Sequence, residues 1–461
     1  MTYILSAVSR CHYSILFVVF LPAITLRLFW RSIKVPDYRR RIAERFGVFS
    51  VPAKWLDSSS SDKSSTIVFH AVSVGETMAV LPVIKRLLIE QPSVRCVVTC
   101  STPTGSTQIQ QRLSQEIDAG RVFHVYLPYD VPMCVNAFLA RIKPHVLVVV
   151  ETELWPNLLS MCQRKGIKTA LINARLSDKS CRAYSKISGI AGEMMGNLDK
   201  VLPQDAVSAE RFRSLGVPSD RSEVTGNVKF DVPITPKMNM QATEFRARLL
   251  SSRNGSVLIA GSTHPGEDEI VFEAFRALML QCEEAQCDDE TQAPRLIIVP
   301  RHPERFDDVF EMALSLGFNA SKYSQWMNDS LSHTLDERGD VLVVDEMGQL
   351  LTLYGVSDVA LVCGSLLPSL GGHNLLEPAV WGVPVLSGKG VFNFQSMSDD
   401  MVAAGALSLV SNADELCRAW CAVLQDACHA RQAGEAARRF VMDNQGAVER
   451  TVTVLNSLIF D

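Results

Sequence analysis

Short apolar runs alternate with longer helical patterns along most of the chain, as in βαβ units with a parallel sheet. In the first half the expected strands are 66–72, 95–100, 122–126, 146–151, 169–173 and 201–203. In the second half they are 257–260, 295–299, 341–344, 359–362 and 383–386, separated by expected helices at about 267–282, 304–316, 349–355 and 374–382. The two series predict an α/β protein with two Rossmann-like, doubly wound domains.

The N-terminal segment has a different pattern. From Cys11 to Leu26 it carries no acid, Lys or Arg, and several cations follow it: Arg27, Arg31, Lys34, Arg39, Arg40 and Arg41. Counted from Met1, it is long enough for a bilayer span of about 20 residues. A helix lying on the membrane is the alternative, and bulky residues at 28–30 argue against signal-peptide cleavage. Cations on the C-terminal side predict a cytoplasmic main body.

Two prolines in the extended segment 231–236 suggest a linker between the domains. We therefore expect a membrane anchor at 1–34, a first Rossmann-like domain at 35–231, a second at 232–445 and a C-terminal helix at 446–461. Whether this helix crosses back to the first domain stays open. Ligands of such sheets bind at the carboxyl ends of the strands, so the site is expected in a central cleft that both domains face.

Composition removes several function classes. The 461 residues are 47% hydrophobic with a net charge of -5, which provides a large core and disfavours nucleic-acid binding through overall charge. The 12 cysteines form no CxxC pair, which indicates scattered reduced thiols and no zinc site. The sequence has no GxxxxGK[ST] loop, no GxGxxG after the first strand and no Asp-x-Asp at a strand end. Nucleotide-triphosphatase and dehydrogenase functions thus lose their main support, and no metal is expected.

A double glycine follows the strand at 359–362. Gly371 and Gly372 allow close approach of the backbone to a ligand, and Asn374 and Glu377 share a face at the start of a helix. Free N–H groups there favour phosphate, and a carboxylate accepts hydrogen bonds from sugar hydroxyls. This predicts a nucleotide-sugar site. The alternative is a plain helix N-terminus with a capping carboxylate.

Two acidic clusters also lie at strand ends. Gly75 is expected to allow a tight strand-to-helix turn, and Glu76 is either a general base or a helix cap. Glu151 and Glu153 follow another strand, where extended geometry would point both side chains the same way. Solvated loop acids are the alternative for the second pair.

Cations complete the candidate site. Lys229, near the linker, is expected either to stabilise a leaving phosphate or to lie on the surface paired with Asp231. Arg301 follows a buried strand and is placed to bind phosphate or carboxylate. The backbone at 345–349 is expected to contact a base or a ribose.

Several segments together resemble the Kdo transferases of lipopolysaccharide assembly, which move 3-deoxy-D-manno-octulosonic acid (Kdo) from CMP-Kdo to a lipid A precursor (lipid IVA). The segments are Ser73–Thr77, Glu151–Asn157, Asn173–Ser177, Gly226–Asp231, Val299–Phe306 and Gly371–Glu377. The resemblance covers about residues 26–446. It implies a GT-B fold, inverting and metal-independent transfer without a cofactor, and an inner-membrane anchor with the catalytic body on the cytoplasmic side.

The resemblance also implies residue roles. Glu76 would be the general base, and Glu151 and Lys229 would stabilise the transition state. The residues implied in CMP binding are Pro300, Arg301, Met347, Gly348, Gln349, Asn374, Leu375, Leu376 and Glu377. Further candidates are Ser73, Gly75, Ser262, Thr263, Gly371 and Gly372.

Three positions depart from the family pattern. Cys363 stands where a glycine is usual and is expected to narrow the phosphate loop slightly, and Leu370 replaces an arginine. Leu375 replaces a proline, which keeps both polar groups, Asn374 and Glu377. Two other functions are kept as alternatives: a nucleotide-sugar 2-epimerase of the same fold, and a non-enzymatic lipid-binding scaffold.

Overall fold

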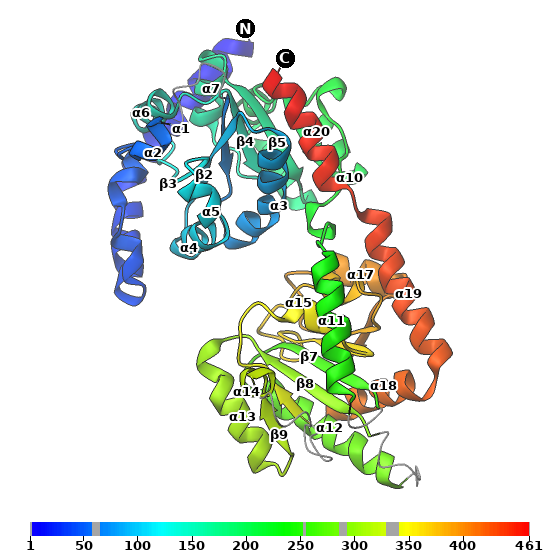
Figure 1. Ribbon diagram of the computed structural model, residues 1–461. Coiled ribbons are helices and arrows are strands. Elements are labelled where there is room, and N and C mark those ends of the chain that lie inside the picture. The colour runs from blue at the N-terminus through cyan, green and yellow to red at the C-terminus, as the bar shows by residue number, and fades with distance from the viewer. Residues whose placement is uncertain (1, 58–64, 252–254, 285–292, 329–340, 461) are drawn as a thin grey trace. The chain divides into compact units, whose positions relative to one another are not determined.

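The computed structural model describes residues 2–57, 65–251, 255–284, 293–328 and 341–460. Contacts between Cα atoms divide the chain into two compact units. Unit 1 comprises Met1–Asp231 and Gln445–Asp461, and unit 2 comprises Val232–Asn444 (Figure 1). Each unit has its own parallel sheet covered by helices.

Unit 1 contains, among its described residues, a six-stranded parallel sheet in the order β3-β2-β1-β4-β5-β6. Its strands are β1 (Ser65–His70), β2 (Val94–Cys100), β3 (Val122–Tyr126), β4 (Val146–Val150), β5 (Lys168–Ala174) and β6 (Lys200–Pro203). Apolar residues fill these strands because helices cover both faces of the sheet. The order 3-2-1-4-5-6 is that of a doubly wound Rossmann sheet.

Helices pack on each face of this sheet. The described helices of unit 1 are α1 (Thr2–Lys34), η1 (Pro36–Arg39), η2 (Ile42–Phe46), α2 (Ala53–Asp57), α3 (Val74–Glu90), α4 (Pro103–Arg112), α5 (Ser114–Asp118), α6 (Pro132–Ile142), α7 (Pro156–Arg164), α8 (Asp178–Lys186), α9 (Ser188–Gly196), α10 (Ala206–Ser214), η4 (Ser219–Arg221), η5 (Val228–Phe230) and α20 (Ala447–Phe460). Leu87 of α3 and Leu455 of α20 belong to the core on one face, and Phe138 of α6 and Met195 of α9 to the core on the other.

The C-terminal helix α20 packs against α3 within unit 1. The Asp231 carboxylate accepts hydrogen bonds from the backbone N–H groups of Gly446 (2.6 Å) and Val448 (2.5 Å) at the start of this helix. Arg450 Nε donates to the carbonyl of Thr225 at 2.8 Å. Asp231 is therefore a capping residue for α20.

Unit 2 contains, among its described residues, a seven-stranded parallel sheet in the order β13-β12-β11-β7-β8-β10-β9. Its strands are β7 (Val257–Thr263), β8 (Arg295–Pro300), β9 (Ala320–Lys322), β10 (Val341–Val343), β11 (Val359–Val362), β12 (Val385–Gly388) and β13 (Ser408–Val410). The sheet is again buried between helices, so its central strands are continuous apolar runs.

The helices of unit 2 are α11 (Pro236–Leu249), α12 (Glu267–Glu284), η7 (Pro303–Arg305), α13 (Phe306–Ser315), α14 (Tyr323–Asn328), α15 (Leu350–Tyr354), α16 (Leu376–Ala379), α17 (Gln395–Ala403), α18 (Ala413–Gln425) and α19 (Ala427–Asn444). Phe272 and Phe275 of α12 share one core with Trp420 of α18. Arg246 of α11 pairs with both oxygens of Asp358, at 2.9 and 3.0 Å, just before β11.

The prediction of two parallel-sheet α/β domains is confirmed. Three details differ. The strands β9 and β13 were not predicted, because three residues are too few to give a periodic signal. The helix expected at 374–382 covers only Leu376–Ala379. The strand expected at 383–386 begins only at Val385, since Pro384 has no N–H for the ladder.

The apolar N-terminal segment forms the first part of α1. Within the described residues, Arg10–Ile33 is the one stretch of helix long and apolar enough to cross a membrane, by length and composition alone. The described cysteines are free thiols.

Candidate functional site

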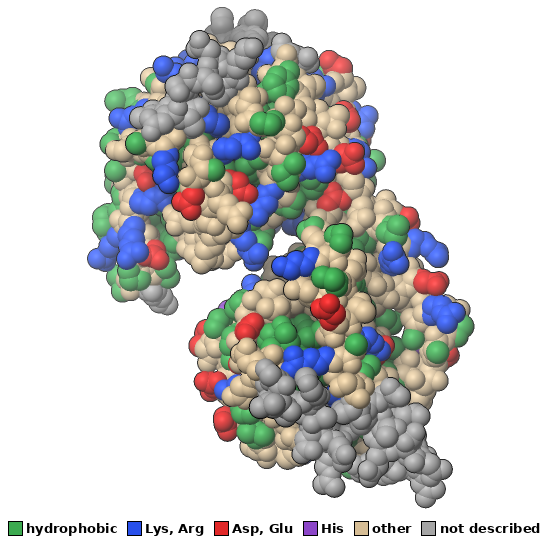
Figure 2. Space-filling model, viewed as in Figure 1, with side chains coloured by type: hydrophobic (Ala, Val, Ile, Leu, Met, Phe, Trp, Pro, Cys, Tyr) green, Lys and Arg blue, Asp and Glu red, His purple; other side chains and the backbone are tan. Residues whose placement is uncertain are grey.

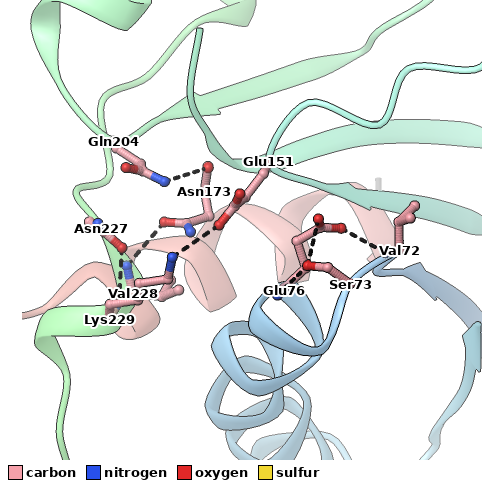
Figure 3. A network of polar contacts seen from close by, with 9 residues as sticks. All are labelled: Val72, Ser73, Glu76, Glu151, Asn173, Gln204, Asn227, Val228 and Lys229. Atoms are coloured by element: carbon pink, nitrogen blue, oxygen red, sulfur yellow. Dashed lines mark hydrogen bonds and ion pairs between the residues drawn. The ribbon is translucent and has the colours of Figure 1, made fainter. Parts of the chain in front are cut away.

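Glu76 lies in the first turn of α3, directly after β1 (Figure 3). Ser73 caps the helix: its Oγ accepts a hydrogen bond from the N–H of Glu76 (3.1 Å) and donates one to Glu76 Oε1 (2.9 Å). Glu76 Oε2 accepts from the N–H of Val72 at 2.6 Å. This reciprocal arrangement is a capping box, so the carboxylate does serve the helix start. The same hydrogen bonds fix the position of the Glu76 carboxylate.

Burial raises the pKa of the Glu76 carboxyl above its usual range, against the hydrogen bonds from Val72 and Ser73, and the charge of Glu151 raises it further. Only 8% of the residue is exposed. A carboxylate with a raised pKa is a stronger base than an ordinary glutamate. Capping and proton abstraction are therefore compatible at this position.

Gly75 is not needed for the turn. It has no positive φ, and a Cβ placed on it would meet only Ser73 Oγ, at 3.8 Å. The expectation that Gly75 permits a tight strand-to-helix turn is wrong, because Ser73, in extended conformation, ends the turn and begins the helix.

Glu151 follows β4 in the left-handed conformation, with φ +60°. It is not extended, so the expectation that Glu151 and Glu153 point the same way from an extended segment is wrong. A non-glycine residue with positive φ costs about 1–3 kcal/mol and persists only where its surroundings enforce it. Here the Glu151 N–H donates to the carbonyl of Ile172 at 3.0 Å, which fixes the bend.

The bend directs the Glu151 carboxylate to Lys229, whose Nζ lies 3.3 Å from Oε1 (Figure 3). Both side chains are partly exposed, at 23% and 35%. Lys229 is thus not paired with Asp231, which caps α20. The structure places the two predicted transition-state residues in contact, although 78 positions separate them in the chain.

Three amides hold this ion pair in place. Asn227 Oδ1 accepts from the N–H of Lys229 at 3.0 Å, and Asn173 Oδ1 accepts from the N–H of Val228 at 3.1 Å. Gln204 Nε2 donates to the carbonyl of Asn173 at 2.9 Å. Asn173 also has a positive φ, +51°. These amides were not predicted as site residues from the sequence. An asparagine at the end of a strand, in the resembling segment 173–177, was the available signal.

In unit 2, most of the residues predicted to bind CMP lie at the carboxyl ends of β7, β8 and β11. Ser262 and Thr263 end β7, and Ser262 has φ +62°. Pro300 ends β8, and the N–H of Arg301 donates to the carbonyl of Thr263 at 3.0 Å. The side chain of Arg301 is exposed. One cation therefore stands beside two adjacent strand ends.

Glu377 belongs to the same group. Its Oε1 accepts from Asn374 Nδ2 at 3.2 Å. Burial raises the pKa of Glu377, while the Asn374 hydrogen bond and the charge of Arg301 lower it. Leu375 and Leu376 are fully buried, and the N–H of Leu376 donates to Asn374 Oδ1 at 3.2 Å.

The double glycine closes the loop between β11 and α16. Gly371 and Gly372 have φ +89° and +83°, and a Cβ on Gly371 would lie 2.3 Å from Asn393 Nδ2. Only glycine fits there without displacement. Cys363, by contrast, is fully buried in the core of unit 2.

Two histidines beside Arg301 are further residues that were not predicted from the sequence. His264 Nε2 and His373 Nε2 are 2.9 Å apart, and the rings stack at 5.2 Å. Burial lowers the pKa of His373 to about 4, and the charges of Arg301 and His264 add to this effect. When both rings are neutral, one ring can donate its Nε2–H to the Nε2 of the other, which accounts for the short contact.

Glu267, at the start of α12, organises the loop from within. Its carboxylate is fully buried and accepts from the N–H groups of Gly364 (2.7 Å), Ser365 (2.9 Å) and Leu366 (2.9 Å). It also accepts from the N–H of His264 at 3.0 Å. The sequence did not point to Glu267, because its loop partners lie about 100 residues away.

The segment Met347–Gln349 follows β10. Met347 is exposed, Gly348 has φ +89°, and Gln349 Nε2 donates to Glu346 Oε2 at 3.2 Å. This leaves the backbone of the segment accessible. Across the part of the chain that the structure describes, no group of three or more His, Cys, Asp or Glu side chains is arranged to hold a metal ion.

The family model and a curated relative identify one family. A family model described as 3-deoxy-D-manno-octulosonic-acid transferase (kdotransferase) matches residues 40–232. A 3-deoxy-D-manno-octulosonic acid transferase of Haemophilus influenzae is 34% identical over 447 residues, covering 97% of this chain and 98% of that protein. The C-terminal CMP-Kdo binding domain of WaaA from Acinetobacter baumannii is 30% identical, covers 45% of this chain and 99% of its own, and has a TM-score of 0.39.

A putative UDP-N-acetylglucosamine 2-epimerase from Listeria monocytogenes has a similar structure. Its TM-score is 0.52 over 86% of this chain and 96% of that chain, at 14% identity. At this identity the likeness concerns the fold alone and does not favour one activity over another.

Proposed function

The chain belongs to the 3-deoxy-D-manno-octulosonic acid (Kdo) transferase family, and from this premise we propose that it transfers Kdo from CMP-Kdo to a lipid A precursor, lipid IVA. The transfer inverts the sugar carbon and needs no metal. One observation carries the proposal: the buried Glu76 carboxylate, with its raised pKa, lies within electrostatic reach of the Glu151–Lys229 pair. A base next to a fixed pair of opposite charges suits an acceptor hydroxyl and an ionising donor.

In the proposed reaction, an acceptor hydroxyl oxygen bonds to the anomeric carbon of Kdo, and its proton passes to Glu76. The bond between that carbon and the phosphate oxygen breaks, and its electron pair leaves with CMP. Positive charge develops on the sugar while negative charge builds on the phosphate. Glu151 suits the first charge and Lys229 the second, because a hydrogen bond from the backbone N–H of each residue fixes its position before the reaction, to the carbonyl of Ile172 and to Asn227 Oδ1.

Donor binding is proposed for the strand ends of unit 2. Arg301 supplies a cation for the phosphate, and Glu377 with Asn374 supplies acceptors and donors for sugar hydroxyls. The exposed backbone of Met347–Gln349 suits the base or ribose. The leaving group is a monophosphate that cations and backbone donors can stabilise, so the mechanism works without a divalent ion.

We also propose inner-membrane attachment through α1, with the catalytic body on the cytoplasmic side. The apolar stretch Arg10–Ile33 supports attachment, and the cations that follow it support this orientation.

The test is a transfer assay with CMP-Kdo and lipid IVA in detergent with EDTA, followed by mass spectrometry of the lipid. A mass increase of one or more Kdo units is expected. No product in EDTA, with activity restored by Mg²⁺, would refute the metal-free mechanism. No lipid product under any condition, with a sugar nucleotide isomerised instead, would favour the epimerase.

A further inference from the structure

The third turn of α1 is attached to the globular part of unit 1. Arg10 forms an ion pair with Glu193 of α9 and donates to Ser160 of α7. The two charged side chains are only 14% and 15% exposed. Separating the two partners would give up a charge-assisted hydrogen bond, which is stronger than one between neutral groups.

The next turns continue the contact on the same face of α1. Ser14 Oγ lies 3.1 Å from Asn157 Oδ1 and 3.0 Å from Asn157 Nδ2. Asn157 is itself fixed by Asp130, whose Oδ2 accepts from its N–H at 2.9 Å. Phe17 packs between Tyr129 and Trp155, with ring centroids 6.3 and 6.4 Å away. Positions 10, 14 and 17 follow helical spacing, so one continuous stripe of α1 is docked.

The chain is fastened to unit 1 again just after α1 and η1. Arg41 donates to Ser106 Oγ at 3.1 Å and to the carbonyl of His124 at 3.0 Å. Glu44 Oε2 accepts from the N–H of Tyr126 at 2.8 Å. Residues 18–40, which we call the arm, therefore lie between two points at which the chain is attached to the globular part of unit 1.

The arm projects from unit 1 in Figure 1, and Figure 2 shows hydrophobic and basic side chains together on it. Its exposed large apolar residues are Val18, Val19, Phe20, Leu26, Phe29, Trp30, Ile33 and Val35. Its exposed cations are Arg27, Arg31, Arg39 and Arg40. Apolar and tryptophan side chains beside arginines match the boundary between acyl chains and anionic headgroups.

The end of the arm is folded back on itself. Arg39 Nε donates to Ser32 Oγ at 2.6 Å, and the Arg31 guanidinium lies 4.8 Å from the centre of the Tyr38 ring. From Val18 to Lys34 the helix rises about 26 Å, which is less than the hydrocarbon core of about 30 Å. The part of the helix beyond the docked turns is therefore at the lower limit of a bilayer span, and the chain is attached to unit 1 on both sides of it.

We propose that α1 is an interfacial helix that enters one anionic leaflet through its arm and does not cross the bilayer. A crossing helix would place residues 10–17 on the opposite side from unit 1 and break every contact with α7 and α9. The inference rests on the proposed membrane attachment and specifies its geometry, since the docked end of α1 stays on the same side as the catalytic body.

The decisive experiment is a protease-protection assay on the full-length protein with different epitope tags at its two ends. Spheroplasts and inverted inner-membrane vesicles are compared. Both tags are expected to be protected in spheroplasts and digested in inverted vesicles. Digestion of the N-terminal tag alone in spheroplasts would overturn the inference but leave attachment intact. Recovery of the whole protein in the soluble fraction would refute the proposed attachment itself.

Charge reversal tests the docked end independently. Arg10→Glu and Glu193→Arg are each expected to lower the melting temperature of the membrane-bound enzyme, and the double reversal is expected to restore much of the loss. If neither single reversal changes the melting temperature in native membranes, although both do in detergent, α1 is undocked in the bilayer and the inference fails.

Vesicle binding tests the arm. The triple variant Phe29→Ser, Trp30→Ser and Ile33→Ser is expected to lower partitioning into phosphatidylglycerol vesicles at least tenfold. Arg27→Gln with Arg31→Gln is expected to lower it in these vesicles but not in neutral phosphatidylcholine, by about fivefold per charge. Val207→Ser, which removes an exposed valine from α10, is the matched control. Unchanged binding of the triple variant would show that the arm does not enter lipid.

Discussion

Replacing Glu76 by glutamine separates its two roles. The side-chain amide oxygen of the introduced glutamine can still accept from the N–H of Val72, and the backbone N–H at position 76 still donates to Ser73 Oγ. The cap therefore survives in large part. The amide cannot take a proton from an acceptor hydroxyl, so the turnover number should fall by about 10²–10⁴.

The stability change in the glutamine variant combines two opposing effects. Burial raises the pKa of Glu76 in the folded protein, so the folded state favours the protonated form and the ionised form reduces stability at neutral pH. This contribution is favourable at low pH and is lost as the pH rises through the raised pKa. A neutral glutamine avoids the loss but gives up charge-assisted hydrogen bonds worth about 1.5–3 kcal/mol. The two effects oppose each other, so only a small net change in the melting temperature is expected.

Alanine removes the base and the reciprocal half of the capping box, while the Ser73 cap stays. Glu76→Ala should lose the same activity as the glutamine variant and also destabilise the protein by about 1–3 kcal/mol, because the N–H of Val72 loses its acceptor. The assays are kcat for Kdo transfer in detergent, CMP affinity and thermal denaturation. A glutamine variant that retains a tenth or more of the wild-type kcat would refute the assignment of Glu76 as the base.

Three further predictions concern the neighbouring charges and the loops. Glu151→Gln removes a negative charge that raises the Glu76 pKa, so the acid limb of the plot of kcat/KM against pH should move to lower pH. An acid limb that does not move would show that the charge of Glu151 has no effect on the base. Glu267→Ala leaves the N–H groups at 364–366 without their acceptor, which should cost about 1–3 kcal/mol for each unsatisfied group and raise the donor KM; an unchanged donor KM would limit Glu267 to a structural role. Asp231→Ala removes the cap of α20 and should destabilise unit 1 by about 0.5–2 kcal/mol with little effect on the donor KM, and a large change in that KM would contradict the reasoning.

The sequence was sufficient for much of the fold because its signals are local. Continuous apolar runs mark buried parallel strands, and the segments between them carry helical spacing, so the two sheets could be predicted strand by strand. Prediction failed for β9 and β13 and for the extent of α16, where three or four residues cannot establish a period. It also failed for the backbone at Glu151, because a positive φ outside glycine leaves no trace in the residue type.

The residue types of the candidate site were also available from the sequence, whereas their partners were not. Glu76, Glu151, Lys229 and Arg301 stand out at strand ends without any structure. That Lys229 contacts Glu151 rather than Asp231 depends on a bend after β4 and on the amides of Asn173 and Asn227.

For α1, too, the sequence gives the residue types but not their distant partners. The apolar length of α1 follows from composition, but its docking depends on Arg10 meeting Glu193 across 183 positions. Local sequence determines which segments become helices and strands, because backbone geometry and burial act over a few residues. Only the folded chain decides which distant side chains meet, because that depends on how the sheets and helices pack.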